Sequence, residues 1–156
     1  MATYTKLNRK DIQSLADNYG LKITEFSALD GGNGNTSYIL KTKQSSYVLT
    51  VCDNKKLDEV YNMGQLLLLL ETHNVPSNNL ISPINSDTIT TFKTTDGVKP
   101  VILKDYIEGQ VVEQLDEVML YQFGIQTAQL NQIPPPAYLP TDHPYGLQFF
   151  SKIRGL

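Results

Sequence analysis

A glycine-rich stretch between apolar strand patterns is the feature that most constrains how this chain folds. It reads Asp30-Gly31-Gly32-Asn33-Gly34-Asn35, and strand-like patterns follow at 36–42 and 46–52. Glycines allow a sharp turn and a close approach of backbone to a bound group, because no side chain obstructs them. Strands joined by such short connections pair antiparallel. The stretch therefore predicts an antiparallel sheet with a glycine loop at the end of two strands.

The rest of the chain predicts an α+β fold. A helix over 56–73 is favoured by apolar residues at helical spacing, and its run Leu66–Leu70 indicates cover on more than one side. A second amphipathic helix over 113–132 is expected to point Leu115, Val118, Met119, Phe123, Thr127 and Leu130 inward. The segment 143–147 predicts a turn before one last short helix. With a first helix over 9–19, the expected sheet of about five strands has these members: 21–29, 36–42, 46–52, 88–94 and 100–107.

Composition narrows the class of protein. The 156 residues fit one domain or one and a part, and the net charge of −3 argues against a general nucleic-acid surface. Cys52 is the single cysteine, so an intramolecular disulfide is excluded and a reducing compartment is indicated. No apolar signal core opens the chain, and the longest leucine run is far shorter than a membrane span. We therefore expect a soluble cytoplasmic protein that binds neither nucleic acid nor membrane.

Short motifs follow one another in a characteristic order. They are the glycine loop with Asn35, Tyr47-Val48-Leu49-Thr50, Leu66–Leu70 before Asn74-Val75-Pro76, Lys99-Pro100, Tyr106-Ile107-Glu108-Gly109, and Thr127-Ala128-Gln129-Leu130-Asn131. Over residues 20–150 this set resembles the N-terminal lobe of the aminoglycoside phosphotransferase and choline kinase superfamily, which has a protein-kinase-like fold. Within it, the type II homoserine kinases look most similar. The resemblance implies a kinase-like N-terminal lobe at 1–109. It also implies a hinge exit and the start of a truncated helical C-terminal lobe at 110–156.

The resemblance also implies roles for individual residues. The loop over the phosphates of ATP would consist of Gly31, Gly32, Asn33, Gly34 and Asn35. Val48 would pack on adenine, and the backbone of Asp105, Tyr106 and Ile107 would form the hinge at the adenine edge. In the wider superfamily the strand carries a lysine that grips the phosphates and pairs with a helix glutamate.

Thr50 stands at the position of that lysine, with Val48 and Cys52 on the same face of the strand. The homoserine-kinase-like group resembles this chain in carrying threonine there. The cationic side chain that would bind the phosphates of ATP is then unassigned. Its candidates are Lys41, Lys55 and Lys56, with Glu59 as a partner.

The catalytic motifs of the superfamily are missing from this sequence. The His-x-Asp-x-x-x-x-Asn loop has no counterpart, since His73 precedes Asn74-Val75 and His143 precedes Pro144-Tyr145. No catalytic residue and no metal ligand is therefore assigned, and the chain alone is expected to be inactive. The intact protein is expected to use ATP with Mg²⁺ and to phosphorylate the hydroxyl of a small acceptor held by the missing lobe.

Two other readings stay open. One is a stand-alone, non-catalytic module that binds a nucleotide or a partner; it predicts that the helix over 113–132 closes its own core. The truncated-kinase reading predicts exposed apolar surface on that helix, and hence dimerisation or poor solubility. The other is an α+β scaffold without nucleotide affinity.

Structural explanations also exist for the site residues. A glycine stretch between strands is often only a tight turn, and Thr50 suits any strand. Glu59 suits a helix N-terminus, and Asp105 and Glu108 suit a solvated strand end.

Overall fold

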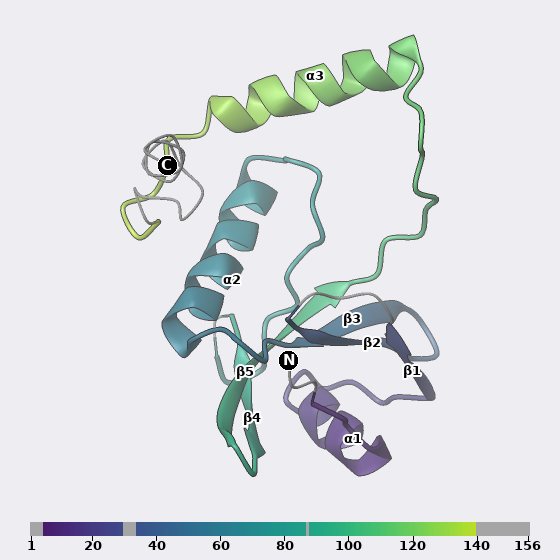
Figure 1. Ribbon diagram of the computed structural model, residues 1–156, viewed down its shortest axis with the longest axis vertical. Coiled ribbons are helices and arrows are strands. Elements are labelled where there is room, and N and C mark those ends of the chain that lie inside the picture. The colour runs from purple at the N-terminus through teal and green to yellow at the C-terminus, as the bar shows by residue number, and fades with distance from the viewer. Residues whose placement is uncertain (1–4, 30–33, 87, 140–156) are drawn as a thin grey trace, which may run out of the picture.

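The computed structural model describes residues 5–29, 34–86 and 88–139. In these ranges five strands form one antiparallel sheet in the order β1-β2-β3-β5-β4, with a helix on each face and a third helix beyond (Figure 1). The strands are β1 (Glu25–Leu29), β2 (Thr36–Lys41), β3 (Ser46–Val51), β4 (Thr90–Thr94) and β5 (Gly97–Asp105). The helices are α1 (Arg9–Asp17), α2 (Leu57–Thr72) and α3 (Glu117–Asn131). The predicted α+β fold, with a five-stranded antiparallel sheet and a long helix packed on it, is confirmed.

The alternation of side chains along β3 and β5 divides the core into two layers. Leu49, Val51 and Leu103 are fully buried against the α1 side, where Ile12, Leu15 and Ala16 cover them. Cys52 and Ile102 are fully buried on the α2 side, beside Val60 of the helix. Each face of the sheet therefore has its own helix, and the two central strands lie between them.

Helix α1 begins where its capping residues place it. The side chain of Asn8 accepts hydrogen bonds from the N–H groups of Lys10 and Asp11, and the Asp11 carboxylate accepts one from the Asn8 N–H. This capping box satisfies donors that a helix start leaves unpaired. The strand predicted from residue 21 begins only at Glu25. The Gln13 side chain occupies the Leu21 carbonyl and the Ile23 N–H, so these groups are not available to the sheet ladder.

Helix α2 lies close against the segment that enters β4. Val60 and Gly64 are its buried residues, and a Cβ at position 64 would lie 2.9 Å from the Cβ of Thr88. Glycine at this position allows the close approach of helix and segment. At the start of α2, the Lys56 N–H donates to the Glu59 carboxylate at 2.8 Å. Glu59 therefore has the helix-start role that its position indicates.

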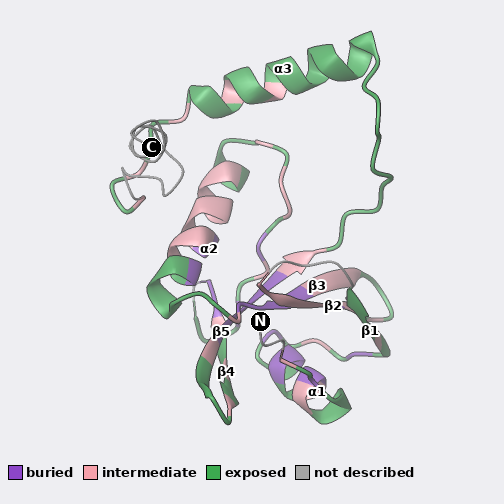
Figure 2. Ribbon diagram, viewed as in Figure 1, coloured by how far each residue is buried: buried purple, intermediate pink, exposed green. Residues whose placement is uncertain are grey.

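Helix α3 contributes no residue to the core (Figure 2). Asp116 caps it by accepting from the Met119 N–H at 2.8 Å, so it begins later than predicted. The prediction that its apolar residues face inward was wrong, because in the described residues no element packs over them. All six are exposed: Leu115, Val118, Met119, Phe123, Thr127 and Leu130.

Few contacts join α3 to the rest of the fold. The Gln129 side chain donates to the His73 carbonyl at 2.9 Å, beyond the end of α2 (Figure 1). None of the helices in the described part of the chain has the length and apolarity that a bilayer crossing requires. The short helix expected near the C-terminus lies outside the described residues.

Candidate functional site

On the sheet face toward α2, neighbouring strands place their side chains in rows across the sheet, which we call ranks. The first rank, nearest the glycine loop, consists of Ser37, Thr50 and Ile102 on β2, β3 and β5. The next rank is Ile39, Val48 and Lys104. Beyond it, β5 ends at Asp105 and the chain leaves the sheet. Along this face, the predicted phosphate loop, then Val48, predicted to pack on adenine, and then the predicted hinge therefore follow one another.

Only the end of the glycine loop can be described. Gly31, Gly32 and Asn33 lie outside the described residues. Gly34 has a φ of +85°, which disfavours a side chain, and its carbonyl accepts from the Asn54 side chain at 3.3 Å. Asn35 is half-buried. The loop end is thus attached to the turn that follows β3.

Thr50 brings no charge to this face. It is 8% exposed, and its hydroxyl lies 3.0 Å from that of Ser37. Opposite the sheet, α2 presents an apolar side at Val60, Met63 and Gly64. The described residues therefore place neither a strand lysine nor a helix glutamate in the first rank.

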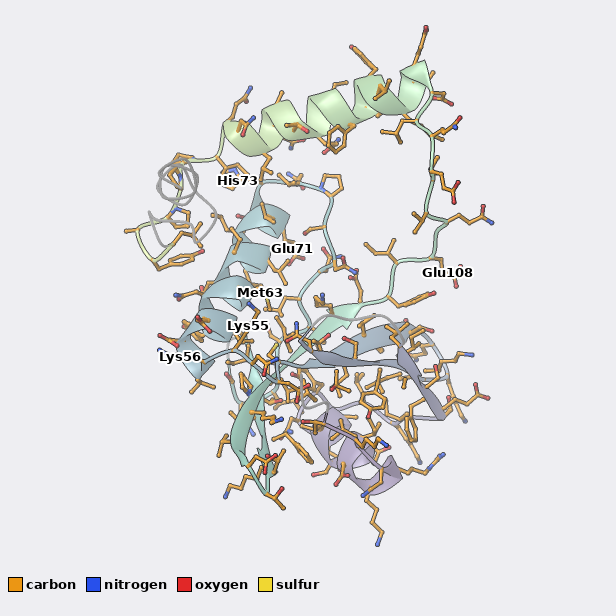
Figure 3. The ribbon with its side chains drawn as sticks, viewed as in Figure 1. Lys55, Lys56, Met63, Glu71, His73 and Glu108 are labelled. Carbon is orange, nitrogen blue, oxygen red and sulfur yellow. The ribbon has the colours of Figure 1, made fainter. Side chains whose placement is uncertain are left out.

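The three candidate lysines have different surroundings. The exposed Lys41 ammonium pairs with Glu25 at 3.3 Å, at the far end of β2. Lys56 precedes the first residue of α2 and is exposed, and Glu59 caps its backbone. Lys55 is exposed in the turn after β3, near the start of α2 (Figure 3). The Lys55 N–H donates to the Cys52 carbonyl at 3.5 Å, which joins Lys55 to the strand of the first rank.

Cys52 reports the charges near the first rank. Burial raises the pKa of its thiol to about 11, while the charges of Lys55 and Lys104 act to lower that pKa and Asp53 acts to raise it. Both ammonium groups are therefore within electrostatic range of the sulfur. Lys104 was missed by sequence reasoning. Once β3 and β5 are paired, the alternation of side chains would have identified it beside Val48.

The predicted hinge leaves β5 with its backbone only partly occupied. The Asp105 N–H donates to the Asn79 carbonyl at 3.0 Å, and the Tyr106 N–H donates to the Ser46 carbonyl at 3.1 Å. Among the described residues, the Ile107 N–H has no hydrogen-bond partner. Ile107 is 55% exposed, so this donor is accessible to a ligand.

A buried ion pair lies on the other side of the sheet, near the start of β2. Lys99 donates to the Asp53 carboxylate at 2.7 Å, with side-chain exposures of 13% and 1%. Thr36 donates to the same carboxylate at 2.6 Å, and Thr5 contacts both charged groups. Burial acts to raise the Asp53 pKa, but hydrogen bonds from Lys99, Thr36 and Thr5 outweigh it and hold that pKa below its usual range. The pair joins the N-terminal segment to β2 and β5.

The described residues contain no metal-ligand cluster, and one cavity lies away from the ranked face. In residues 5–29, 34–86 and 88–139, no group of three His, Cys, Asp or Glu side chains could hold a metal ion. A cavity of about 370 Å³ lies at the turn between β2 and β3. It is lined by Gly20–Thr24, Thr42–Gln44 and Tyr47, and by none of the predicted site residues.

Comparison with known proteins gives a consistent result. The phosphotransferase enzyme family matches residues 25–153. Spectinomycin phosphotransferase in complex with ADP and spectinomycin is similar over 94% of this chain, with 16% identity and a TM-score of 0.72. An AMP-bound complex of the same enzyme is similar over 82% of the chain, with 16% identity and a TM-score of 0.62. A microcompartment-associated aminopropanol kinase is similar over 83%, with 17% identity and a TM-score of 0.63.

The match covers only part of each solved protein. The chain spans 45% of the first spectinomycin phosphotransferase chain, 38% of the second and 43% of the aminopropanol kinase. At these identities the structural likeness shows a shared fold.

Proposed function

This chain belongs to the phosphotransferase enzyme family, and on that premise we propose that it is the nucleotide-binding small lobe of an ATP-dependent small-molecule phosphotransferase. The intact protein transfers the γ-phosphate of ATP to a hydroxyl group, as a homoserine-kinase-like or aminoglycoside-phosphotransferase-like enzyme. Residues 1–109 form the nucleotide lobe, and residues 110–156 leave the hinge and begin the helical lobe. Acceptor recognition and the groups that hold Mg²⁺ belong to that second lobe.

One observation carries the proposal: a single sheet face presents, in order, the groups that a nucleotide needs. Gly34 ends the glycine loop at one end, and Val48 supplies an apolar, half-buried surface in the middle. The Ile107 N–H, without a partner among the described residues, lies where the chain leaves β5. Adenine needs an apolar surface and one or two backbone partners at its edge, whereas phosphates need donors and positive charge.

The described residues fit a nucleotide better than they fit a metal ion. Val48 and Ile39 lie next to each other on β3 and β2 and form a surface for the base. Ile107 offers the base edge an N–H. The Asp105 carbonyl accepts from the Asn78 side chain at 3.4 Å and keeps a second lone pair for the base. In the part of the chain that the structure describes, no carboxylate cluster could hold a metal. The contribution of this chain is therefore to bind and orient the nucleotide.

The exposure of α3 distinguishes this reading from the stand-alone module. A self-contained module requires the last helix to close its own core, and α3 buries no residue. The exposed apolar side of α3 instead suits the first helix of a larger helical lobe, as the truncated-kinase reading expects. No observation favours the module.

The direct test is a titration of the chain with ADP and Mg²⁺, in which NMR monitors the chemical shifts of the backbone amides. The expected shift changes lie at Gly34, Val48 and Ile107, with none in α1. Ile107→Pro removes the hinge N–H, whereas Ile107→Ala keeps it and serves as the matched control. Loss of a buried hydrogen bond to a ligand corresponds to about a tenfold fall in affinity.

Each outcome decides the proposal. Binding that Ile107→Pro weakens and Ile107→Ala leaves unchanged supports it, provided both variants keep the unfolding midpoint of the wild type. Shift changes confined to the cavity beside Tyr47 would move the site away from this face. No binding of ADP by the chain would overturn the nucleotide role of this lobe.

A further inference from the structure

We propose that Lys104, on β5, supplies the phosphate-binding cation that Thr50 cannot supply. The inference rests on the proposed nucleotide function and assigns a residue to it. A nucleotide phosphate carries negative charge, and a site that holds it in a partly dry cleft needs a cation or an array of donors. On the ranked face, the first rank offers only two hydroxyl groups and an apolar side chain.

The register of the sheet places Lys104 one rank from Thr50. Lys104 pairs with Val48, and Ile102 pairs with Thr50, so all four side chains lie on the α2 side. Ranks on one face of a strand are about 7 Å apart. The long, flexible stem of lysine spans such a distance, which allows its ammonium group to reach the phosphate end from a neighbouring strand.

The charge of Lys104 acts toward the phosphate end of the face. The Cys52 thiol lies beyond Thr50 as seen from Lys104, and the Lys104 charge still acts on its pKa. Lys104 is half-buried, and among the described residues it forms no ion pair and no side-chain hydrogen bond. An ammonium group without a partner in the protein is available to an anionic ligand at this face.

The surroundings of Lys104 also explain the apolar side of α2. A strand lysine at position 50 would need a carboxylate on the helix to hold it. Here Val60, Met63 and Gly64 face the sheet instead, and the Glu59 carboxylate caps the helix. The Lys104 backbone lies between two partners, Val48 on β3 and Leu80 on the other side of β5. The strand lysine and the helix glutamate of the wider superfamily are therefore both absent here, and Lys104 would supply the cation without a helix carboxylate.

The test compares ADP with adenosine, because only ADP carries phosphates. NMR titrations of the 156-residue chain would include Lys104→Met, Lys104→Arg, Lys55→Met and Lys93→Met. The methionine at 104 keeps the apolar stem, the arginine keeps the charge, and Lys93 is an exposed lysine on β4. We expect Lys104→Met to lower the affinity for ADP by about 10- to 100-fold, while the affinity for adenosine stays within about twofold of the wild type. Lys104→Arg should restore most of the ADP affinity, and Lys93→Met should match the wild type.

Several results would overturn the assignment. An unchanged ADP affinity in Lys104→Met, or an equal loss of ADP and adenosine, would show that Lys104 does not act on phosphates. An effect of Lys55→Met alone would give the role to Lys55. If the wild type binds adenosine and ADP equally, the lobe holds a base without a phosphate site. If it binds neither, the proposed function itself fails, which is a distinguishable result.

Discussion

At the scale of single residues, the Asp53–Lys99 pair is the clearest case of a charge held by its surroundings. Its carboxylate is almost completely buried and accepts from Lys99, Thr36 and Thr5. A buried carboxylate with these partners is stable, but a buried carboxylate that loses its cation is not. The residues come from four separate parts of the chain, so their meeting also fixes how those parts are packed.

Lys99→Met should destabilise the fold strongly. It removes the cation and leaves the Asp53 carboxylate buried without a counter-charge, which costs about 3–5 kcal/mol. The measurement is the free energy of unfolding from urea titration at neutral pH. Lys93→Met is the matched control, because Lys93 is exposed on the adjacent strand. A loss no larger than that of the control would show that the pair contributes little.

The pH dependence of the same pair has a definite sign. The folded-state pKa of Asp53 lies below that of the unfolded chain, so its stabilisation is present above the ordinary carboxyl range. It is lost as the pH falls through the lowered folded-state value.

Cys52 should react slowly in the folded protein. Burial raises its pKa to about 11, so little thiolate exists at pH 8, and the sulfur is inaccessible. We expect alkylation by iodoacetamide at pH 8 to be slow in the native chain and fast in urea. Fast alkylation of the native protein would show that the packing around Cys52 opens often.

A site residue could be predicted from the sequence when its place depends on a pattern within one strand or helix. It could not be predicted when its place depends on pairing with a distant segment. The places of Val48 and Thr50 followed from alternation along one strand, and they do share a face with Cys52. Lys104 could not be found, because its relation to Val48 depends on the register between two strands far apart in the sequence. The Asp53–Lys99 pair had no local pattern at all.

At the scale of elements, the sequence pattern located each helix and strand of residues 5–29, 34–86 and 88–139 to within a few residues at most ends. Periodicity identifies an element, while its ends depend on side chains from elsewhere. Gln13 delays the start of β1, and Asp116 sets the start of α3. Periodicity also cannot say what covers an apolar face. That is why the inward orientation assigned to the last helix failed.

Gly64→Ala should destabilise the packing of α2. Its Cβ would lie 2.9 Å from Thr88, and overpacking of this kind costs about 1–3 kcal/mol. The better helix propensity of alanine returns only about 1 kcal/mol. We expect a net loss of up to about 2 kcal/mol in the free energy of unfolding, combining these two effects.

Gly124→Ala is the matched control on α3. A Cβ there would meet nothing within 4 Å, so only the propensity gain remains. Helicity should rise, and the free energy of unfolding should not fall. An equal change in both variants would mean that α2 does not lie as close to Thr88 as the structure shows.

At the scale of the whole molecule, the fold divides into a packed lobe and an attached helix. The two core layers lie entirely within residues 5–109, on either side of the sheet. Beyond them the chain runs through an exposed segment to α3, whose apolar side chains face outward. An exposed apolar surface of this kind is typical of a docking face for further protein. The boundary proposed at residue 109 therefore separates parts with different contributions to stability.

A chain that ends at Gly109 should fold as well as the 156-residue chain. In the described residues, the hydrogen bonds that cross the boundary come from exposed side chains: Gln129 donates to His73 and Asn74, and Asn62 donates to Tyr138. Exposed bonds of this kind contribute roughly 0.5–1.5 kcal/mol at most. The shortened chain should lose the α3 helical signal in circular dichroism, yet keep its urea midpoint and the slow alkylation of Cys52. A clearly lowered urea midpoint, or a rapidly alkylated Cys52, would show that residues after 109 support the core and would place the lobe boundary further along the chain.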